Sequence, residues 1–217
     1  MITRRPIICC ILSALLLASC SAIGSPTPER VVRRVKVLGD VSLRARNTRW
    51  TEEVRGLIEA ASDYYEREFG VRLVAQSVSA WPLEERSRGT PELLARLEQD
   101  FPQTKKQDHD LVIAFTAEGM SRYTRAGRPR VDRIGNCQEG LGGYAVVPVS
   151  RVVHYTGWRG NPEPEVIALI HEIGHIFGAQ HVADPASIMH EDFDYRSEFD
   201  ATNRAVIERN KLCRFGK

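Results

Sequence analysis

Three histidines and a glutamate lie within one short segment, HEIGHIFGAQH, at residues 171–181. His171 and His175 are four residues apart, so a helix places them on one face with their Cβ atoms about 5–6 Å apart. Two imidazoles in that position can bind the same metal ion. Gly178 favours a turn after the helix, because glycine adopts the left-handed conformation that often ends helices. Such a turn would bring His181 to the same ion.

Three histidine ligands leave a fourth position open for water, which is typical of a catalytic zinc site. We therefore expect one catalytic Zn²⁺ bound by His171, His175 and His181. Zinc lowers the pKa of bound water to about 7 in favourable sites. Glu172 lies beside the first ligand, where it can act as the general base that takes this proton and passes it to a leaving amine. The segment thus predicts zinc-dependent hydrolysis of peptide bonds.

The spacing HExxHxxGxxH, followed by a methionine turn, resembles the metzincin signature. Residues 187–189 (SIM) look like this turn, in which Met189 would form a floor beneath the ligands. The short gap between His181 and Met189, with Pro185 inside it, resembles the matrixin branch. The resemblance extends over residues 31–217 and implies a zinc endopeptidase that acts on polypeptides.

Two further segments resemble matrixin strands. Residues 110–115 (DLVIAF) are similar to the central strand, and residues 143–148 (GYAVVP) are similar to the antiparallel edge strand. In metzincins that edge pairs with extended substrate by strand addition. Pro148 also favours an edge position, because proline cannot donate to the strand ladder. The resemblance thus implies that substrate binds at Gly143, Tyr144, Ala145 and Val146.

Matrixins also carry a structural zinc, bound by histidines and aspartates after the central strand. In this chain His109 and His154 are isolated, so the expected zinc content is the single catalytic ion.

Hydrophobic periodicity predicts the elements that position these residues. The expected strands are 31–43, 71–78, 111–116 and 142–149, and the expected helices are 51–69, 91–101, 165–177 and 200–212. Thr51 and Asp200 are the expected N-caps of two of the helices. This order indicates an α/β (α+β) domain with a mixed sheet followed by a helical end. The resemblance implies a metzincin-like catalytic domain, with a twisted mixed sheet, an antiparallel edge strand, an active-site helix and a C-terminal helix.

The N-terminus has the pattern of an export signal. Arg4 and Arg5 precede an apolar run at residues 7–18. This run is shorter than the roughly 20 residues of a membrane span, although an uncleaved anchor stays an alternative. Residues 17–20 (LASC) resemble the lipobox of bacterial lipoproteins, which implies cleavage before Cys20 and lipidation of Cys20.

The lipobox divides the chain into three parts: a lipoprotein signal peptide (1–19), a lipidated cysteine with its tether (20–30) and the zinc peptidase domain (31–217). The protein is therefore expected to be exported and anchored to a bacterial membrane through lipid. In a host with two membranes, Ser21 implies the outer membrane.

The charge balance argues against nucleic-acid binding, and the cysteines bear on lipidation and on a disulfide. Of 30 basic and 28 acidic residues, two arginines lie in the signal, which leaves 28 of each sign and no basic bias toward nucleic acid. Cys9 and Cys10 leave with the signal, and Cys20 is assigned to lipid. Cys137 and Cys213 can form a disulfide in an oxidising compartment, or remain as two buried thiols. The oligomeric state stays open.

Two other functions stay open. One is a lipoprotein that binds zinc without catalysis, since secreted folds are reused for binding. The other is a hydrolase of cell-wall amides, which the lipid anchor and the arginine-rich loop at 122–133 favour. That loop can equally be a solvated surface segment.

Overall fold

The computed structural model describes residues 30–83, 89–103, 107–117, 128–149, 164–192 and 198–216. The expected signal peptide, Cys20 and all but the last residue of the tether lie outside this range. In chain order the elements are β1 (Val31–Gly39), α1 (Val41–Arg46), α2 (Trp50–Phe69), β2 (Val71–Ala80), α3 (Thr90–Asp100), β3 (Leu111–Thr116), β4 (Arg130–Val131), β5 (Tyr144–Pro148), α4 (Pro164–Ile176) and α5 (Ala201–Asn210).

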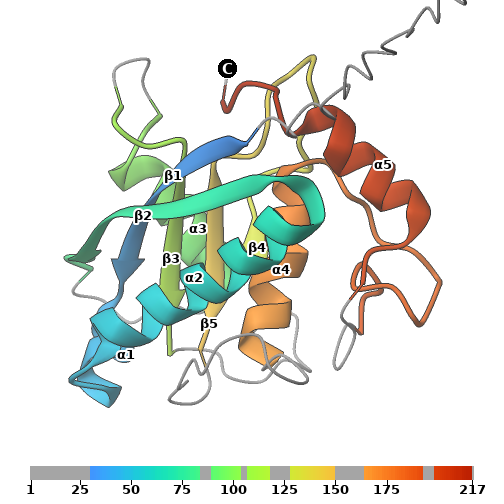
Figure 1. The fold of residues 1–217 in the computed structure, drawn as a ribbon. Helices are drawn as coiled ribbons and strands as arrows, with labels where there is room; N and C mark the ends of the chain where they lie inside the picture. The colour runs from blue at the N-terminus through green and yellow to red at the C-terminus, as the bar shows by residue number, and fades with distance from the viewer. Residues whose placement is uncertain are drawn as a thin grey trace, which may run out of the picture.

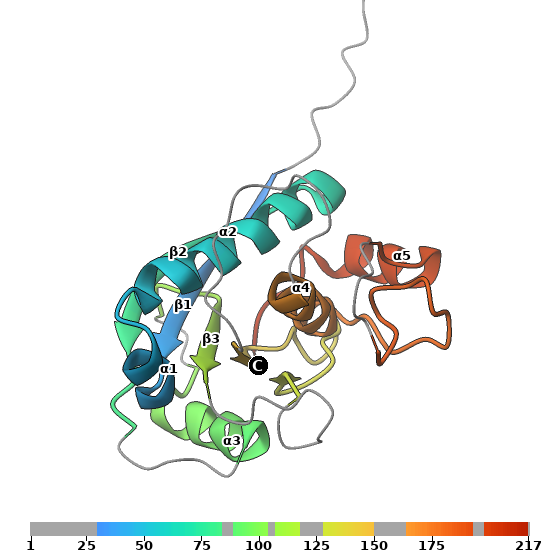
Figure 2. The same ribbon diagram turned by 90° about the horizontal axis from the view of Figure 1, so that it is seen from below.

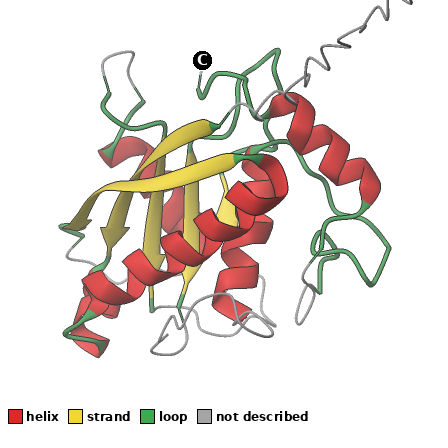
Figure 3. Cartoon of the chain, viewed as in Figure 1, coloured by secondary structure: helices red, strands yellow, loops and turns green. Residues whose placement is uncertain are grey.

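The strands form one mixed sheet in the order β2-β1-β3-β5-β4 (Figures 1 and 3). β2, β1, β3 and β5 are parallel, and the two-residue strand β4 adds to β5 in the antiparallel direction. Every residue of the central strand β3 is buried, as expected for a strand covered on both faces. The structure confirms the expected mixed α/β fold.

Helices cover both faces of the sheet (Figure 2). On one face, α2 and α4 contribute to the larger hydrophobic core. On the other face, α3 packs Leu93 and Leu97 against a smaller core that includes Trp81 and Val112. α5 lies beside α4, away from the sheet (Figures 1 and 2). The sheet is thus the middle layer, and α4 lies between it and α5.

Aromatic side chains join α2 to α4 and α5. The ring of Tyr65 lies between 5.5 and 6.2 Å from the rings of Phe69, Phe177 and Phe199, measured between centroids. Such pairs stabilise a core beyond the apolar area that they bury. The Tyr65 hydroxyl donates to the carbonyl of Ile170 at 2.8 Å, directly before the first of the three histidines. This hydrogen bond helps to fix the position of α4 relative to α2.

The predicted helices and strands are found, with two local differences at the N-terminal end. The first strand was expected to reach residue 43, but it ends at Gly39 because the Asp40 side chain accepts from the Leu43 backbone N–H and caps α1. Thr51 was expected to cap the helix at 51–69, but α2 begins at Trp50, after Arg49. The expected cap at Asp200 is confirmed, since its side chain accepts from the Asn203 N–H.

The assignment of the antiparallel edge strand to residues 143–148 was wrong. β5 is parallel to β3, with Ala145 opposite Ile113, and its other side pairs with β4, where Ala145 lies opposite Val131. β5 is therefore an inner strand, and β4 takes the edge. Pro148 lies at the last position of β5, where the ladder ends and a missing N–H costs little.

The expected disulfide between Cys137 and Cys213 is present, with the two Cα atoms 5.2 Å apart. It joins the loop between β4 and β5 to the C-terminal segment. Leu141 continues this link, since its N–H donates to the Arg214 carbonyl and its carbonyl accepts from the Gly216 N–H. A loop of this length stabilises the fold by about 4–5 kcal/mol on the chain-entropy account. Within the described residues, no helix has the length and apolar composition needed to cross a membrane.

Candidate metal centre

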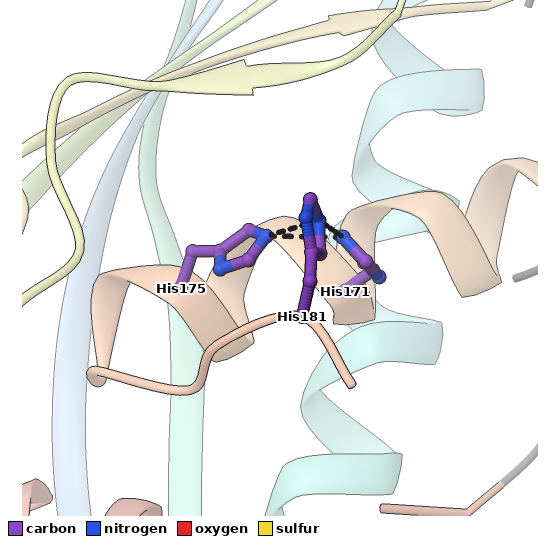
Figure 4. Close-up of side chains that lie close together, drawn as sticks. All are labelled: His171, His175 and His181. Carbon is purple, nitrogen blue, oxygen red and sulfur yellow. Dashed lines mark hydrogen bonds between the residues drawn. The ribbon is translucent and has the colours of Figure 1, made fainter. Parts of the chain in front are cut away.

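Three imidazoles converge beside α4 (Figure 4). His171 and His175 extend from α4, and His181 extends from the loop that follows the helix. Each pair of their Nε2 atoms is separated by 3.1 Å. The structure therefore brings together the three histidines that the sequence predicted as ligands.

The other ring nitrogens decide what these Nε2 atoms can do. The Nδ1 of His171 lies 2.7 Å from the Ile188 carbonyl, and the Nδ1 of His175 lies 2.7 Å from the Ala179 carbonyl. A carbonyl accepts only, so each Nδ1 must donate, and the Nε2 of a neutral ring is then left with a lone pair. Lone pairs that face one another repel, and a cation between them removes the repulsion.

The spacing fits zinc. Three nitrogens 3.1 Å apart are equidistant from a central point about 1.8 Å from each, slightly less than the zinc–nitrogen bond length of about 2.0–2.1 Å. The nitrogen donors and their open geometry match a zinc site that retains a position for water.

Burial keeps the histidines ready for a metal. It lowers the pKa of His171 well below the ordinary value, and the neighbouring His175 adds to the effect. Burial also lowers the pKa of His175, to about 4, and lowers the pKa of the more exposed His181. All three rings are therefore neutral at pH 7, and zinc does not have to displace protons from them.

Glu172 lies on the same helix, one residue after the first histidine. Its side chain lines the cavity together with the three imidazoles, and the residue is only 5% exposed. Burial raises the pKa of Glu172 to about 8, and the charge of Arg130 partly offsets this rise. A group whose pKa lies near neutral pH is suited to accept and return a proton.

The turn after α4 depends on glycine, as the sequence predicted. Gly178 has φ of 100°, in the region that favours glycine. A Cβ at this position would lie 2.4 Å from the Gly135 carbonyl oxygen, which excludes any larger residue without a shift of the backbone. The turn lets the Ala179 carbonyl reach back to His175 and brings His181 to the other two rings.

The segment predicted as the methionine turn lies against α4. Met189 is fully buried, and the carbonyl of the preceding Ile188 is the acceptor for His171. Sequence reasoning missed the role of Gly174, which lies between His171 and His175 on α4. A Cβ on Gly174 would lie 3.0 Å from the Met189 sulfur and 3.0 Å from the Phe199 ring, so glycine allows this close packing.

Three polar residues at α5 hold the loop in place, and sequence reasoning missed two of them. The Asn203 side chain accepts from the Gln180 N–H at 2.8 Å and donates to the Gln180 carbonyl at 2.9 Å, directly before His181. Asn210 donates to the Phe177 carbonyl at the end of α4. Asp200, predicted only as a cap, also accepts from Ser187 in the methionine turn. The available signal was the seven-residue spacing of the two asparagines, which places them on one face of a helix.

The cavity has a volume of about 230 Å³ and lies between β4 and α4. Its rim includes Arg128, Arg130 and Val131, so two of the arginines in the 122–133 segment face the site. Arg133 instead pairs with Asp132 at 3.1 Å, and Arg122 and Arg125 lie outside the described residues.

The four residues expected to bind substrate do not line this cavity. Tyr144, Ala145 and Val146 are buried in β5, and the N–H groups of Gly143 and Tyr144 donate to the Asp132 carboxylate. Their backbone is therefore occupied within the sheet, and these residues cannot pair with substrate by strand addition.

Comparison with known families adds to this geometry. A reprolysin-type family model, described as metallo-peptidase family M12, matches residues 29–208. The chain belongs to metallo-peptidase family M12. Membership of this family, together with the three-histidine site, confirms the predicted metzincin-type metallopeptidase with one catalytic zinc.

Among solved structures, the crystal structure of archaemetzincin from Methanopyrus kandleri resembles this M12 chain with a TM-score of 0.52 and 20% sequence identity. The match covers 82% of this chain and 95% of the archaemetzincin chain. At this identity the likeness concerns the fold, and it confirms the metzincin-like architecture. No curated protein matches the chain.

The raised pKa of Glu172 predicts how the stability of the metal-free protein depends on pH. Between the ordinary value of 4.5 and about 8, the folded state binds more protons than the unfolded state, so the free energy of unfolding falls as pH rises. Glu172→Gln removes this loss. The stability of the metal-free variant relative to wild type should therefore rise by about 3 kcal/mol or less from pH 5 to pH 8. Urea unfolding at both pH values measures it, and a difference that does not change with pH would contradict it.

Proposed function

We propose that this chain is a zinc-dependent endopeptidase in which Glu172 is the general base. The observation that carries the proposal is the buried carboxyl group of Glu172 beside three imidazoles that share one cavity. A carboxyl group at this position is suited to transfer a proton beside the metal.

In the proposed mechanism the residues of this chain divide the work. When bound, zinc supplies Lewis-acid polarisation of the scissile carbonyl and an acidified water. Glu172 takes the proton of the attacking water and then donates it to the leaving amine. The low pKa values of His171 and His175 keep both rings neutral, so neither competes with Glu172 for that proton.

We propose that an extended polypeptide binds along β4. Among the described residues β4 pairs only with β5, and its Arg130 and Val131 line the cavity opposite Glu172. Addition of a substrate strand to this edge would place a peptide bond beside the histidines. We also propose that the chain is closest to the matrixin branch of the metzincins. The short spacing between His181 and Met189 supports this.

The general-base role predicts a clean separation of metal binding from turnover. Glu172→Gln removes the proton acceptor without removing a ligand, so the variant should keep one zinc per chain. Its turnover of an unfolded protein substrate should fall by about 10²–10⁴-fold, the usual contribution of general acid–base catalysis. Zinc content by atomic emission and the rate of peptide release measure the two effects.

The control for this experiment is Glu139→Gln, which alters an exposed glutamate in the loop between β4 and β5. It should match wild type in both measurements, and a zinc chelator should abolish its turnover. A Glu172→Gln variant that loses zinc would show that the glutamate is structural. Release of cell-wall fragments without cleavage of protein would identify the amide hydrolase alternative.

We further propose that the protein is exported and anchored to a bacterial membrane through lipid on Cys20. The sequence LASC at 17–20 and the proline-bearing tether that follows support this. The disulfide between Cys137 and Cys213 is also consistent with export, because disulfides persist in oxidising compartments. The anchor would hold the peptidase domain near the membrane on a short polar linker.

The anchor can be tested by growing bacteria that express the full chain with a labelled fatty acid. The wild-type protein should carry the label and sediment with membranes. Cys20→Ser should lose the label, because the only proposed acceptor thiol is gone, whereas the matched control Cys9→Ser should keep it. Unlabelled wild type, or equal labelling of Cys20→Ser, would refute the proposal.

A further inference from the structure

The three histidines differ in the group that lies next to their Nδ1 atom. His171 and His175 each meet a backbone carbonyl at 2.7 Å, and those carbonyls are fixed by the buried turns around them. The Nδ1 of His181 instead faces a side chain, with the Glu191 carboxylate 3.6 Å away. His181 is also the exposed ligand, with 45% of its side chain accessible to solvent.

Glu191 also lies near a positive charge. Its second carboxylate oxygen lies 4.0 Å from the guanidinium of Arg128, which precedes β4. Arg128, Glu191 and His181 all line the cavity. Arg128, Glu191 and His181 thus form a row of charged and polar groups along the cavity. The row leads from the segment before β4 to the loop that carries the third histidine.

We propose that Glu191 is a positioning residue for the metal centre. The carboxylate lies 3.6 Å from the Nδ1 of His181, just beyond hydrogen-bonding distance, and in the zinc-bound state it moves closer and accepts the Nδ1 hydrogen. This bond fixes the tautomer whose Nε2 lone pair faces zinc, and the nearby charge of Arg128 favours that position of Glu191. Metal-binding histidines are oriented by carboxylates or carbonyls in this way, and the carboxylate also makes the ring a better donor. The inference rests on the metal site and not on the proposed peptidase reaction.

The two ion pairs of Glu191, with Arg128 and with His181, are exposed to solvent. Glu191 has 64% of its side chain exposed, and ion pairs of that kind contribute little to folding. Loss of the carboxylate should therefore leave the stability of the metal-free protein unchanged and act on the metal alone. A role through the His181 ring predicts a selective effect of this kind.

The experiment measures zinc affinity without substrate, by competition with a chromogenic chelator. Glu191→Ala should weaken zinc binding by about 10–100-fold, the usual effect of losing such a partner. Glu191→Gln should weaken it less, because the amide oxygen can still accept from Nδ1. Arg128→Gln should give a smaller loss than Glu191→Ala. Thermal unfolding of each metal-free variant should match wild type.

The matched control is Asp192→Asn, which removes one negative charge from the neighbouring residue. Asp192 is exposed and is not among the residues that line the cavity, so its loss should change zinc affinity by less than about twofold. If Asp192→Asn weakens binding as much as Glu191→Ala, the effect is general electrostatic attraction and the proposal fails. It also fails if Glu191→Ala binds zinc as tightly as wild type. Since no turnover is measured, neither outcome depends on the peptidase proposal.

Discussion

Three imidazole Nε2 atoms held 3.1 Å apart form the arrangement on which the rest of the site depends. Two of the three rings are committed by their Nδ1 hydrogen bonds to face the centre with an acceptor. Buried acceptors that face one another are costly unless a donor or a cation lies between them. The arrangement is therefore unfavourable alone and favourable around zinc, so metal binding and the local fold support each other.

Much of the chain serves to maintain this arrangement. The carbonyls that orient His171 and His175 come from the methionine turn and from the turn at Gly178. Both turns are tied to α5, the first through Asp200 and the second through Asn203. The aromatic contacts of Tyr65 on α2 then reach Phe177, just after α4, and Phe199, just before α5. Precise placement of three side chains thus rests on contacts from three helices and two turns, which is typical of preorganised metal sites.

The metal centre could be read from sequence because it is local. The spacing of His171, His175 and Gly178 determines a helix face and a turn, and neither depends on distant partners. The fully apolar run at 111–116 likewise predicts a buried strand in any fold of this class.

Other features depend on partners distant in sequence. The two residues of β4 are too few to show any periodicity, so the edge strand was missed. The run at 143–148 is buried on both faces, and such a run fits a parallel or an antiparallel neighbour equally well. Asp40 ends β1 because its carboxylate meets Leu43 and the Thr116 hydroxyl, and the second of these lies 76 residues away. The contacts of Asn203 and Glu191 similarly appear only when α5 and the cavity are assembled.

X-ray absorption at the zinc edge, on the purified full chain, tests the central claim most directly. The account predicts one zinc per chain with three imidazole nitrogens at about 2.0–2.1 Å and a light oxygen ligand, and no sulfur ligand. Fewer than three imidazoles, a sulfur ligand, or a chain that does not retain zinc would contradict it.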